Sequence, residues 1–225
     1  MSVHLGSVGG TTIEIDPTFF ILVAFFVITS IEGPDSVLTA LLWAPILFVS
    51  ILLHEFGHAT MNGLLGFGSS RIVLGGMGGL TYNSRHAKPW QDVLVSAAGP
   101  AVSFAIWLAA GWMDVHIAYI HTDRFLNAFV PSLAWANLVW GIFNLLPVGT
   151  LDGGHVMANI LKILLPPRPA FVIAVWISMI VGTCVGIYGI FGRQFILTLL
   201  MGMFVYNSYI QWTFYRSFRR PPDPQ

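Results

Sequence analysis

The sequence predicts an all-α polytopic membrane protein with six transmembrane helices. Short membrane-associated β-hairpins are expected at the N-terminus and between the second and third helices. Of the 225 residues, 56% are hydrophobic and 9% are charged, whereas a soluble domain has about 25% charged residues. The mean hydropathy is +0.76. The apolar residues gather in long stretches separated by glycine, proline and polar residues, and a helix needs about 20 such residues to cross a bilayer.

Charge and cysteine content exclude other classes of protein. The formal net charge is zero, which argues against a nucleic-acid-binding protein. The single cysteine excludes an internal disulfide and a cysteine-rich metal site. Residues 1–10 contain no Lys or Arg and no apolar core, so no cleavable signal peptide is expected.

Proline and capping residues delimit the predicted helices. Asp16 and Pro17 suit the N-cap and first position of the first helix. Pro45 predicts a kink in the second, and Pro147 ends the fourth. A shorter helix is expected over residues 153–165. The six spanning helices are predicted at residues 17–31, 36–65, 89–113, 126–146, 170–191 and 194–215.

Two segments have the pattern of β-hairpins. Residues 3–15 alternate weakly in polarity around Gly9-Gly10. Residues 71–74 and 80–82 flank a glycine-rich turn at 75–79. An unpaired strand edge is poorly tolerated in lipid. Either an extended peptide pairs with the second hairpin, or the N-terminal hairpin already covers its edge.

The distribution of basic residues predicts the orientation in the membrane. Six spans put both termini on one side, with eight Lys and Arg residues against two on the other. The positive-inside rule therefore predicts cytosolic termini in an integral protein of the plasma membrane. Residues 216–225 form a basic, proline-rich tail that is expected to be mobile. The eight are Arg71, Arg85, Lys88, Lys162, Arg168, Arg216, Arg219 and Arg220, and the two are Arg124 and Arg193.

Residues 54–58 have the sequence His-Glu-x-x-His within a predicted membrane helix. His54 and His58 are four residues apart, so their side chains share one helix face and can bind one zinc ion. Glu55 can take a proton from a metal-bound water. Ionisable residues at membrane depth are costly unless they serve a site. The alternatives are a chance match and a structural pairing of buried His and Glu.

The end of the fourth helix carries a second group of polar residues, at 144–154. A catalytic zinc has three protein ligands and an open position, and Asp152 is a candidate for the third ligand. The neighbouring glycines would let the chain bring its carboxylate to the metal. Alternatively, Asp152 is the N-cap of the helix that follows.

Together the two motifs resemble the site-2 protease family of intramembrane zinc metalloproteases. The match is H-E-x-x-H at 54–58 with N-x-x-P-x-x-x-L-D-G-G at 144–154. The resemblance implies one zinc ion per chain, bound by His54, His58 and Asp152, with Glu55 as catalytic base. The orientation predicted from the basic residues places this active site toward the cytosolic leaflet. Thr150 is a departure, because relatives often have proline there.

The resemblance also implies an activity and its partners. Family members cleave transmembrane segments of other proteins, so single-span membrane proteins are the expected substrates, within a lipid bilayer. Residues 1–215 would form a single membrane-embedded metalloprotease domain, and no stretch is long enough for an added PDZ or CBS domain. The alternative is a non-catalytic membrane zinc-binding protein or a zinc carrier. The sequence sets no oligomeric state.

Among the remaining candidate residues, Asn144 and His155 each have two interpretations. By resemblance, Asn144 would bind substrate backbone or the developing oxyanion, or it makes an interhelical hydrogen bond. Asn137 is expected to be structural. His155 either lines the cavity or has a surface or capping role. Substrate binding is also expected of the turn glycines, Gly75, Gly76, Gly78 and Gly79.

Overall fold

The computed structural model describes residues 2–31, 33, 36–83 and 87–217. Three features predicted from the sequence lie wholly or partly outside these residues. They are the connection at 32–35 between the first two predicted helices, the basic residues Arg85, Arg219 and Arg220, and the tail at 216–225.

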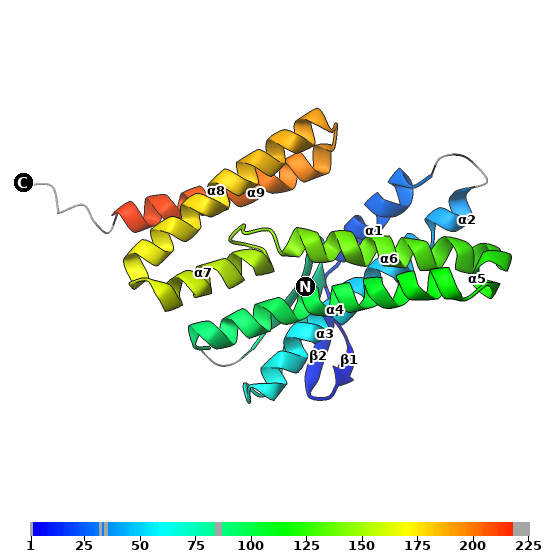
Figure 1. Ribbon diagram of the computed structural model, residues 1–225, viewed down its shortest axis with the longest axis horizontal. Helices are drawn as coiled ribbons and strands as arrows, with labels where there is room; N and C mark the ends of the chain where they lie inside the picture. Colours follow the sequence, from blue (N-terminus) through cyan, green and yellow to red (C-terminus); the bar gives the residue numbers. More distant parts are fainter. Residues whose placement is uncertain (1, 32, 34–35, 84–86, 218–225) are drawn as a thin grey trace, which may run out of the picture. The chain divides into compact units, whose positions relative to one another are not determined.

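Two compact units make up the chain. Residues 1–86 and 97–143 belong to the first, and residues 87–96 and 144–225 to the second. Helix α4 (Pro89–His116) begins in the second unit and continues in the first. Figure 1 follows the elements in chain order.

A four-stranded sheet in the first unit joins the two segments for which the sequence predicts hairpins. Its strands are β1 (Val3–Val8), β2 (Thr11–Ile15), β3 (Arg71–Gly75) and β4 (Gly78–Tyr82), in that spatial order. The outer pairs are antiparallel, whereas β2 and β3 are parallel. The N-terminal hairpin therefore covers the edge of β3. Among the described residues, no strand pairs with the outer edge of β4.

Helix α1 (Thr18–Thr29) begins one residue later than predicted, with Pro17 rather than Asp16 at the N-cap position. The Oδ1 atom of Asp16 accepts hydrogen bonds from the backbone N of Thr18 at 2.9 Å and from its hydroxyl at 2.6 Å. These bonds lower the pKa of Asp16. At the other end, the hydroxyls of Thr29 and Ser30 donate to carbonyls of the last turn. The helix ends at Thr29, two residues before the predicted residue 31, with Ser30 at the C-cap position.

The second predicted helix is interrupted one turn before Pro45. Helix α2 (Val37–Ala40) and helix α3 (Trp43–Leu64) are separated by residues 41 and 42. Proline has no N–H with which to bond the carbonyl four residues earlier. That carbonyl, of Leu41, instead accepts from Ala44 N at 3.2 Å. The predicted kink at Pro45 is thus a break displaced toward the N-terminus.

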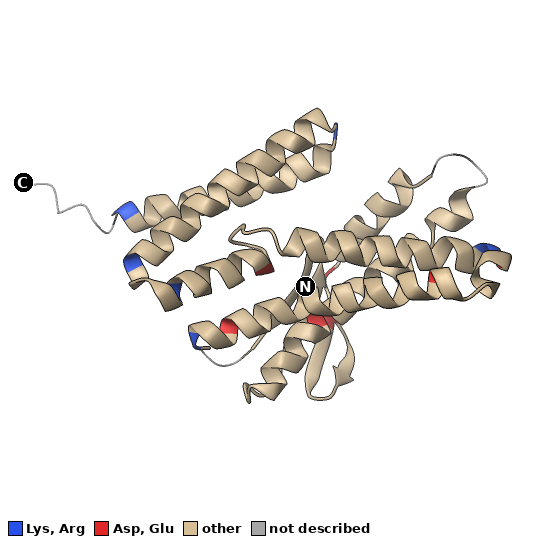
Figure 2. Cartoon of the chain, viewed as in Figure 1, with Lys and Arg blue, Asp and Glu red and all other residues tan. Residues whose placement is uncertain are grey.

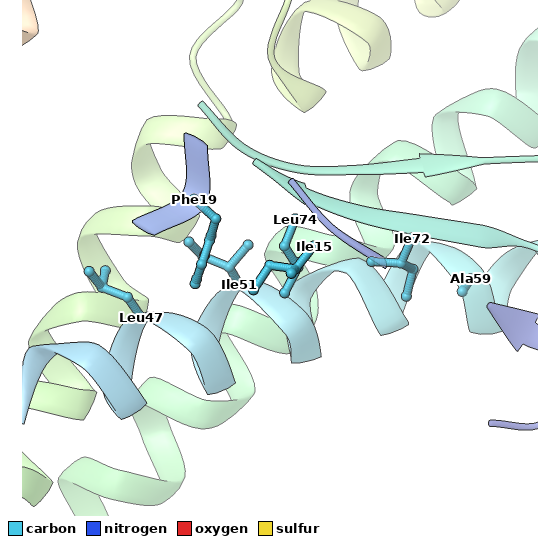
Figure 3. Close-up of a cluster of buried hydrophobic side chains, with 7 residues drawn as sticks. All are labelled: Ile15, Phe19, Leu47, Ile51, Ala59, Ile72 and Leu74. Carbon is cyan, nitrogen blue, oxygen red and sulfur yellow. The ribbon is translucent and has the colours of Figure 1, made fainter. Parts of the chain in front are cut away.

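A buried apolar cluster fixes α3 against the sheet (Figure 3). Strand β2 buries alternate residues, as the two-residue period of a strand requires. Full burial of each large aliphatic or aromatic side chain contributes about 1.5–3 kcal/mol. The second half of α3 is therefore held at the sheet. The cluster comprises Ile15, Phe19, Leu47, Ile51, Ala59, Ile72 and Leu74.

The remainder of the first unit is a helical layer formed by α4, α5 (Tyr119–Thr122) and α6 (Arg124–Asn144). The short helix α5 lies between the third and fourth predicted helices, where the sequence predicts no helix. Asn137 of α6 is fully buried and donates to the Ser50 hydroxyl of α3 at 2.9 Å. The structural role predicted for Asn137 is confirmed.

The second unit contains α7 (Asp152–Leu164), α8 (Pro167–Phe191) and α9 (Phe195–Ser217). Helices α8 and α9 form an antiparallel pair. Phe171 near the start of α8 contacts Tyr215 near the end of α9, with ring centroids 4.9 Å apart. At the opposite end, a Cβ on Gly189 would lie 2.6 Å from the Thr198 hydroxyl. Small residues thus permit close helix packing, as is common in membranes.

Among the residues that the structure describes, five segments are long and apolar enough to cross a membrane. They are Val37–Leu64, Pro89–His116, Arg124–Asn144, Pro167–Phe191 and Phe195–Ser217. Helix α1 is apolar but has 12 residues, about 18 Å at 1.5 Å per residue. That length is less than the ~30 Å of a hydrocarbon core.

An ion pair joins the two hairpins on the exposed side of the sheet. Arg71 donates from Nε and Nη2 to the two carboxylate oxygens of Glu14, at 2.7 Å each. Ser2 also donates to Glu14. The Arg71 bonds are the largest cause of the pKa of Glu14 falling from 4.5 to about 2.

The Glu14–Arg71 pair predicts acid sensitivity of the sheet. Because the folded-state pKa is depressed, the stabilisation is present above pH 4.5 and is lost as the pH falls toward 2. In detergent-solubilised protein, Arg71→Ala and Glu14→Gln should each remove part of the decrease in melting temperature over this interval. The double variant should reduce the decrease in melting temperature no more than either single variant does. Additive effects of the two changes would contradict the pairing.

Candidate metal centre

The histidine pair lies on the part of α3 that packs against the sheet. His54, Glu55 and His58 are 2%, 4% and 6% exposed. One helical turn separates the two imidazoles, and their Nε2 atoms are 3.3 Å apart. The helix spacing predicted from the sequence therefore converges two nitrogen donors on one point.

This arrangement fits a zinc ion. Two nitrogens bound to tetrahedral zinc at about 2.0–2.1 Å lie about 3.3–3.4 Å apart, which matches the separation of the Nε2 atoms. The Nδ1 atom of His54 lies 3.0 Å from the hydroxyl of Ser103, a fully buried residue of α4. If Nδ1 carries the proton and donates to Ser103, Nε2 keeps its lone pair for the metal.

Close approach of α4 encloses the imidazoles. A Cβ on Gly99 would overlap the Nε2 atom of His58 and lie 2.7 Å from that of His54. On the facing side, a Cβ on Gly57 would lie 2.6 Å from the carbonyl oxygen of Ala98. Ala98 and Gly99 belong to a run of small residues of the kind that permits close helix packing, and they lie against the part of α3 that carries the two histidines.

Strand β4 positions the carboxylate of Glu55. The hydroxyl of Thr81 donates to Oε2 of Glu55 at 2.7 Å. A Cβ on Gly79 would lie 2.5 Å from the Cδ and Oε1 atoms of the same side chain. The glycine therefore lets the strand backbone pass directly over the carboxylate, while the threonine fixes its orientation.

The other turn glycines have structural roles that the sequence does not reveal. The Gly76 N–H donates to the Thr18 hydroxyl at 2.9 Å, which ties the turn to the start of α1. Gly78 has φ +115°, and a Cβ there would lie 2.9 Å from the Trp140 ring of α6. Gly75 ends β3 and pairs with Gly78. The predicted substrate-binding role of these glycines stays a prediction.

Asp152 is the first residue of α7 in the second unit. Leu151 occupies the N-cap position, so the alternative that Asp152 is the cap residue does not hold. A Cβ on Gly153 would overlap the Leu145 carbonyl, and one on Gly154 would overlap that of Val148. Only glycine at both positions allows the chain to fold back so tightly beside Asp152.

Two serines hold the loop that precedes Asp152. The Gly149 N–H donates to the Ser178 hydroxyl at 2.8 Å, and Ser178 lies 2.8 Å from the Ser208 hydroxyl. Ser208 donates in turn to the Phe204 carbonyl at 3.0 Å. Both serines are buried. This chain of hydrogen bonds ties the loop to α8 and α9.

The structure brings together some of the predicted residues. His54, Glu55, His58 and Gly79 form one group in the first unit. Asp152, Asn144 and His155 belong to the second unit, where Asn144 ends α6 and His155 is exposed on α7.

No sequence motif identifies Ser103, Thr81 or Gly99 as a neighbour of the candidate site. Ser103 follows the histidines by more than 40 residues, and no motif includes it. The one available signal was the cluster of small residues beside Gly99. It predicts close helix packing without identifying what is packed.

Comparison with known proteins identifies similar families. A peptidase M50B-like family model matches residues 18–130, and a peptidase family M50 model matches residues 110–187. The Synechocystis protein sll0528 is 27% identical over 92% of this chain. Zinc metalloprotease MJ0392 of Methanocaldococcus jannaschii is 29% identical over 91% of it. The chain covers 58% of the length of each of these relatives.

A solved structure has a similar fold. The site-2 protease from Methanocaldococcus jannaschii matches with a TM-score of 0.64 and 26% sequence identity. The match covers 93% of this chain and 94% of that one.

Because Gly99 lies against the imidazoles, one added methyl group there should affect stability and metal binding more than one added elsewhere in α4. Gly99→Ala should lower the free energy of unfolding by about 1–3 kcal/mol, the usual cost of overpacking, and should weaken metal binding. Gly111→Ala in the same helix is the matched control, because no atom lies within 4 Å of its Cβ position. It should be neutral or slightly stabilising.

Thermal unfolding and metal titration of both variants in detergent test this expectation. Equal effects of the two substitutions on melting temperature and metal affinity would contradict the proposed close approach of α4.

Proposed function

The chain belongs to the peptidase M50 family, that of the site-2 proteases, and we propose that it is an intramembrane zinc metalloprotease. In this proposal it hydrolyses a peptide bond in or near the transmembrane segment of a membrane-protein substrate. The observation that carries the proposal is the buried group of His54, Glu55 and His58 within a membrane-length helix. Two convergent imidazoles beside a carboxylate form the core of a zinc hydrolase site.

We assign one zinc ion per chain to His54, His58 and Asp152. A catalytic zinc takes three protein ligands and keeps a fourth position open, so the imidazole pair needs one more donor. Asp152 is the only acidic residue between positions 144 and 217. Its place in the second family motif and beside two structurally required glycines supports this assignment.

Glu55 is assigned as the general base. A zinc ion at this site supplies a Lewis acid that lowers the pKa of a coordinated water toward ~7. Glu55 accepts the proton of the attacking water and returns it to the leaving amine. The bond from Thr81 holds its carboxylate in one orientation throughout. Asn144 is proposed to donate its side-chain amide to substrate backbone.

The outer edge of β4 is the proposed binding site for substrate. A helical substrate segment must unwind before cleavage, because its backbone carbonyls are already hydrogen-bonded. The freed strand can then add to β4 by backbone pairing. Gly79 lies against Glu55, so a strand added there would run beside the base. The turn glycines Gly75, Gly76 and Gly78 would shape the same edge.

We further propose a six-segment arrangement in the plasma membrane. The apolar helix α1 would be the sixth segment, beside the five of spanning length. Both termini would then be cytosolic, with the active site toward that leaflet, as the basic residues indicate. Residues 1–215 would act as one membrane-embedded domain on single-span substrates.

Variants of the assigned residues separate catalysis from metal binding. Glu55→Gln should retain one zinc per chain and lower the cleavage rate by about 10²–10⁴-fold, the usual contribution of a general base. Asp152→Ala should lose zinc affinity and cleavage together. Zinc content and cleavage of a panel of single-span membrane proteins are measured for both.

Matched controls carry the same chemical change away from the site. Glu14→Gln lies on β2 and Asp92→Ala in the first turn of α4, and both should keep zinc and activity. Cleavage by Glu55→Gln at the parental rate would contradict the proposed base. Zinc binding without cleavage of any substrate in the parent would instead favour a non-catalytic zinc-binding protein or carrier.

A further inference from the structure

A cavity of about 270 Å³ lies within the second unit, between α7, α8, α9 and the loop before Asp152. Protein interiors contain few voids larger than one water molecule, so a cavity of this size suits a ligand. Its walls are both apolar and polar. They include His155, Lys162, Phe171, Val175, Ser178 and Ser208.

Small side chains on facing helices create this space. Ala158 on α7 faces Ala170 and Ala174 on α8, so three positions that could hold large apolar residues hold methyl groups. His155, Ala158 and Lys162 recur at three- and four-residue spacing and share one face of α7. The cavity therefore runs along α7, with Lys162 about two turns from His155.

Polarity changes along the cavity. Lys162 and Gln211 are exposed at its rim, whereas Ala174 and Val175 are buried within it. Ser178 and Ser208 are buried too, and both already take part in the hydrogen bonds that hold the loop at Gly149. An occupant would therefore meet a cationic rim and an apolar interior.

The rim lies at the basic end of the second unit. Lys162 is near the end of α7, Arg168 is in the first turn of α8, and Arg216 is near the end of α9. The contact between Phe171 and Tyr215 brings the start of α8 beside the end of α9. Figure 2 shows basic residues where these three helices begin or end, in the second unit. Arg193 is at the opposite end of the α8–α9 pair.

The same end has the features of a membrane surface. Helices α8 and α9 are of spanning length, so their ends lie near the lipid headgroups. Trp176, Trp212 and Tyr215 cluster there, and the Arg216 guanidinium lies 5.9 Å from the Trp212 ring centroid. Aromatic and basic residues are typical of the membrane interface.

We propose that this cavity binds an anionic phospholipid, with the lipid phosphate at Lys162 and one acyl chain along Phe171 and Val175. Basic pockets between membrane helices favour anionic headgroups. The apolar walls suit an acyl chain better than a soluble anion. The excess of basic residues at this end would disfavour a cationic peptide.

Binding of phosphatidylglycerol and of phosphatidylcholine to the detergent-solubilised full chain is compared by native mass spectrometry. The anionic lipid should bind more tightly. Lys162→Ala should weaken its binding about five-fold, the effect expected for one basic residue at a lipid surface. Lys162→Arg should preserve binding. The matched control Arg193→Ala should leave it unchanged.

A second pair of variants tests the acyl-chain part of the site. Ala174→Leu fills the cavity without changing charge and should weaken binding of phosphatidylglycerol. The control Ala105→Leu, at an exposed position of α4, should leave the binding of phosphatidylglycerol unchanged. Melting temperatures show whether each variant is folded.

Three results would overturn the proposal. They are equal affinity for the two lipids, unchanged binding by folded Lys162→Ala, and binding of glycerol phosphate without acyl chains as tight as that of the lipid. Because lipid binding is measured directly, the outcome does not depend on protease activity.

Discussion

Burial of His54, Glu55 and His58 in one apolar helix is the constraint on which the first unit depends. Ionisable groups at membrane depth are unfavourable unless each finds a partner. The structure meets this need from two sides. Helix α4 brings the Ser103 hydroxyl to His54, and β4 brings the Thr81 hydroxyl to Glu55. Glycine occurs at both points of closest approach, Gly99 and Gly79, because a side chain there would displace an imidazole or the carboxylate.

The sheet meets the part of this constraint that concerns Glu55. A strand presents backbone close to its neighbour with few intervening side-chain atoms, especially at glycine. At Gly79, β4 therefore crosses Glu55 as closely as α4 approaches the imidazoles at Gly99. The β2–β3 pairing and the apolar cluster on α3 hold this strand in place. In the proposed protease, the outer edge of β4 would then present substrate to the base that β4 itself orients.

The sequence was sufficient for the features that depend on local pattern. Apolar length predicts the five helices of spanning length among the described residues, the spacing of His54 and His58 predicts converging donors, and Asp16 with Pro17 predicts the start of α1 to within one residue. Features that depend on residues far apart in the sequence could not be predicted in this way. Pairing of β2 with β3 depends on contacts between segments almost 60 residues apart, and Ser103 lies in no motif. The break before Pro45 was misplaced because the missing hydrogen bond acts on the preceding turn.

The ligand set is the central claim, and zinc X-ray absorption spectroscopy on the purified protein tests it most directly. With His54, His58 and Asp152 as ligands, the spectrum should fit two imidazole nitrogens at about 2.0–2.1 Å and oxygen donors at about 2.0–2.2 Å. One zinc per chain should accompany this spectrum. A sulfur shell near ~2.3 Å, or a first shell without two imidazoles, would contradict the account.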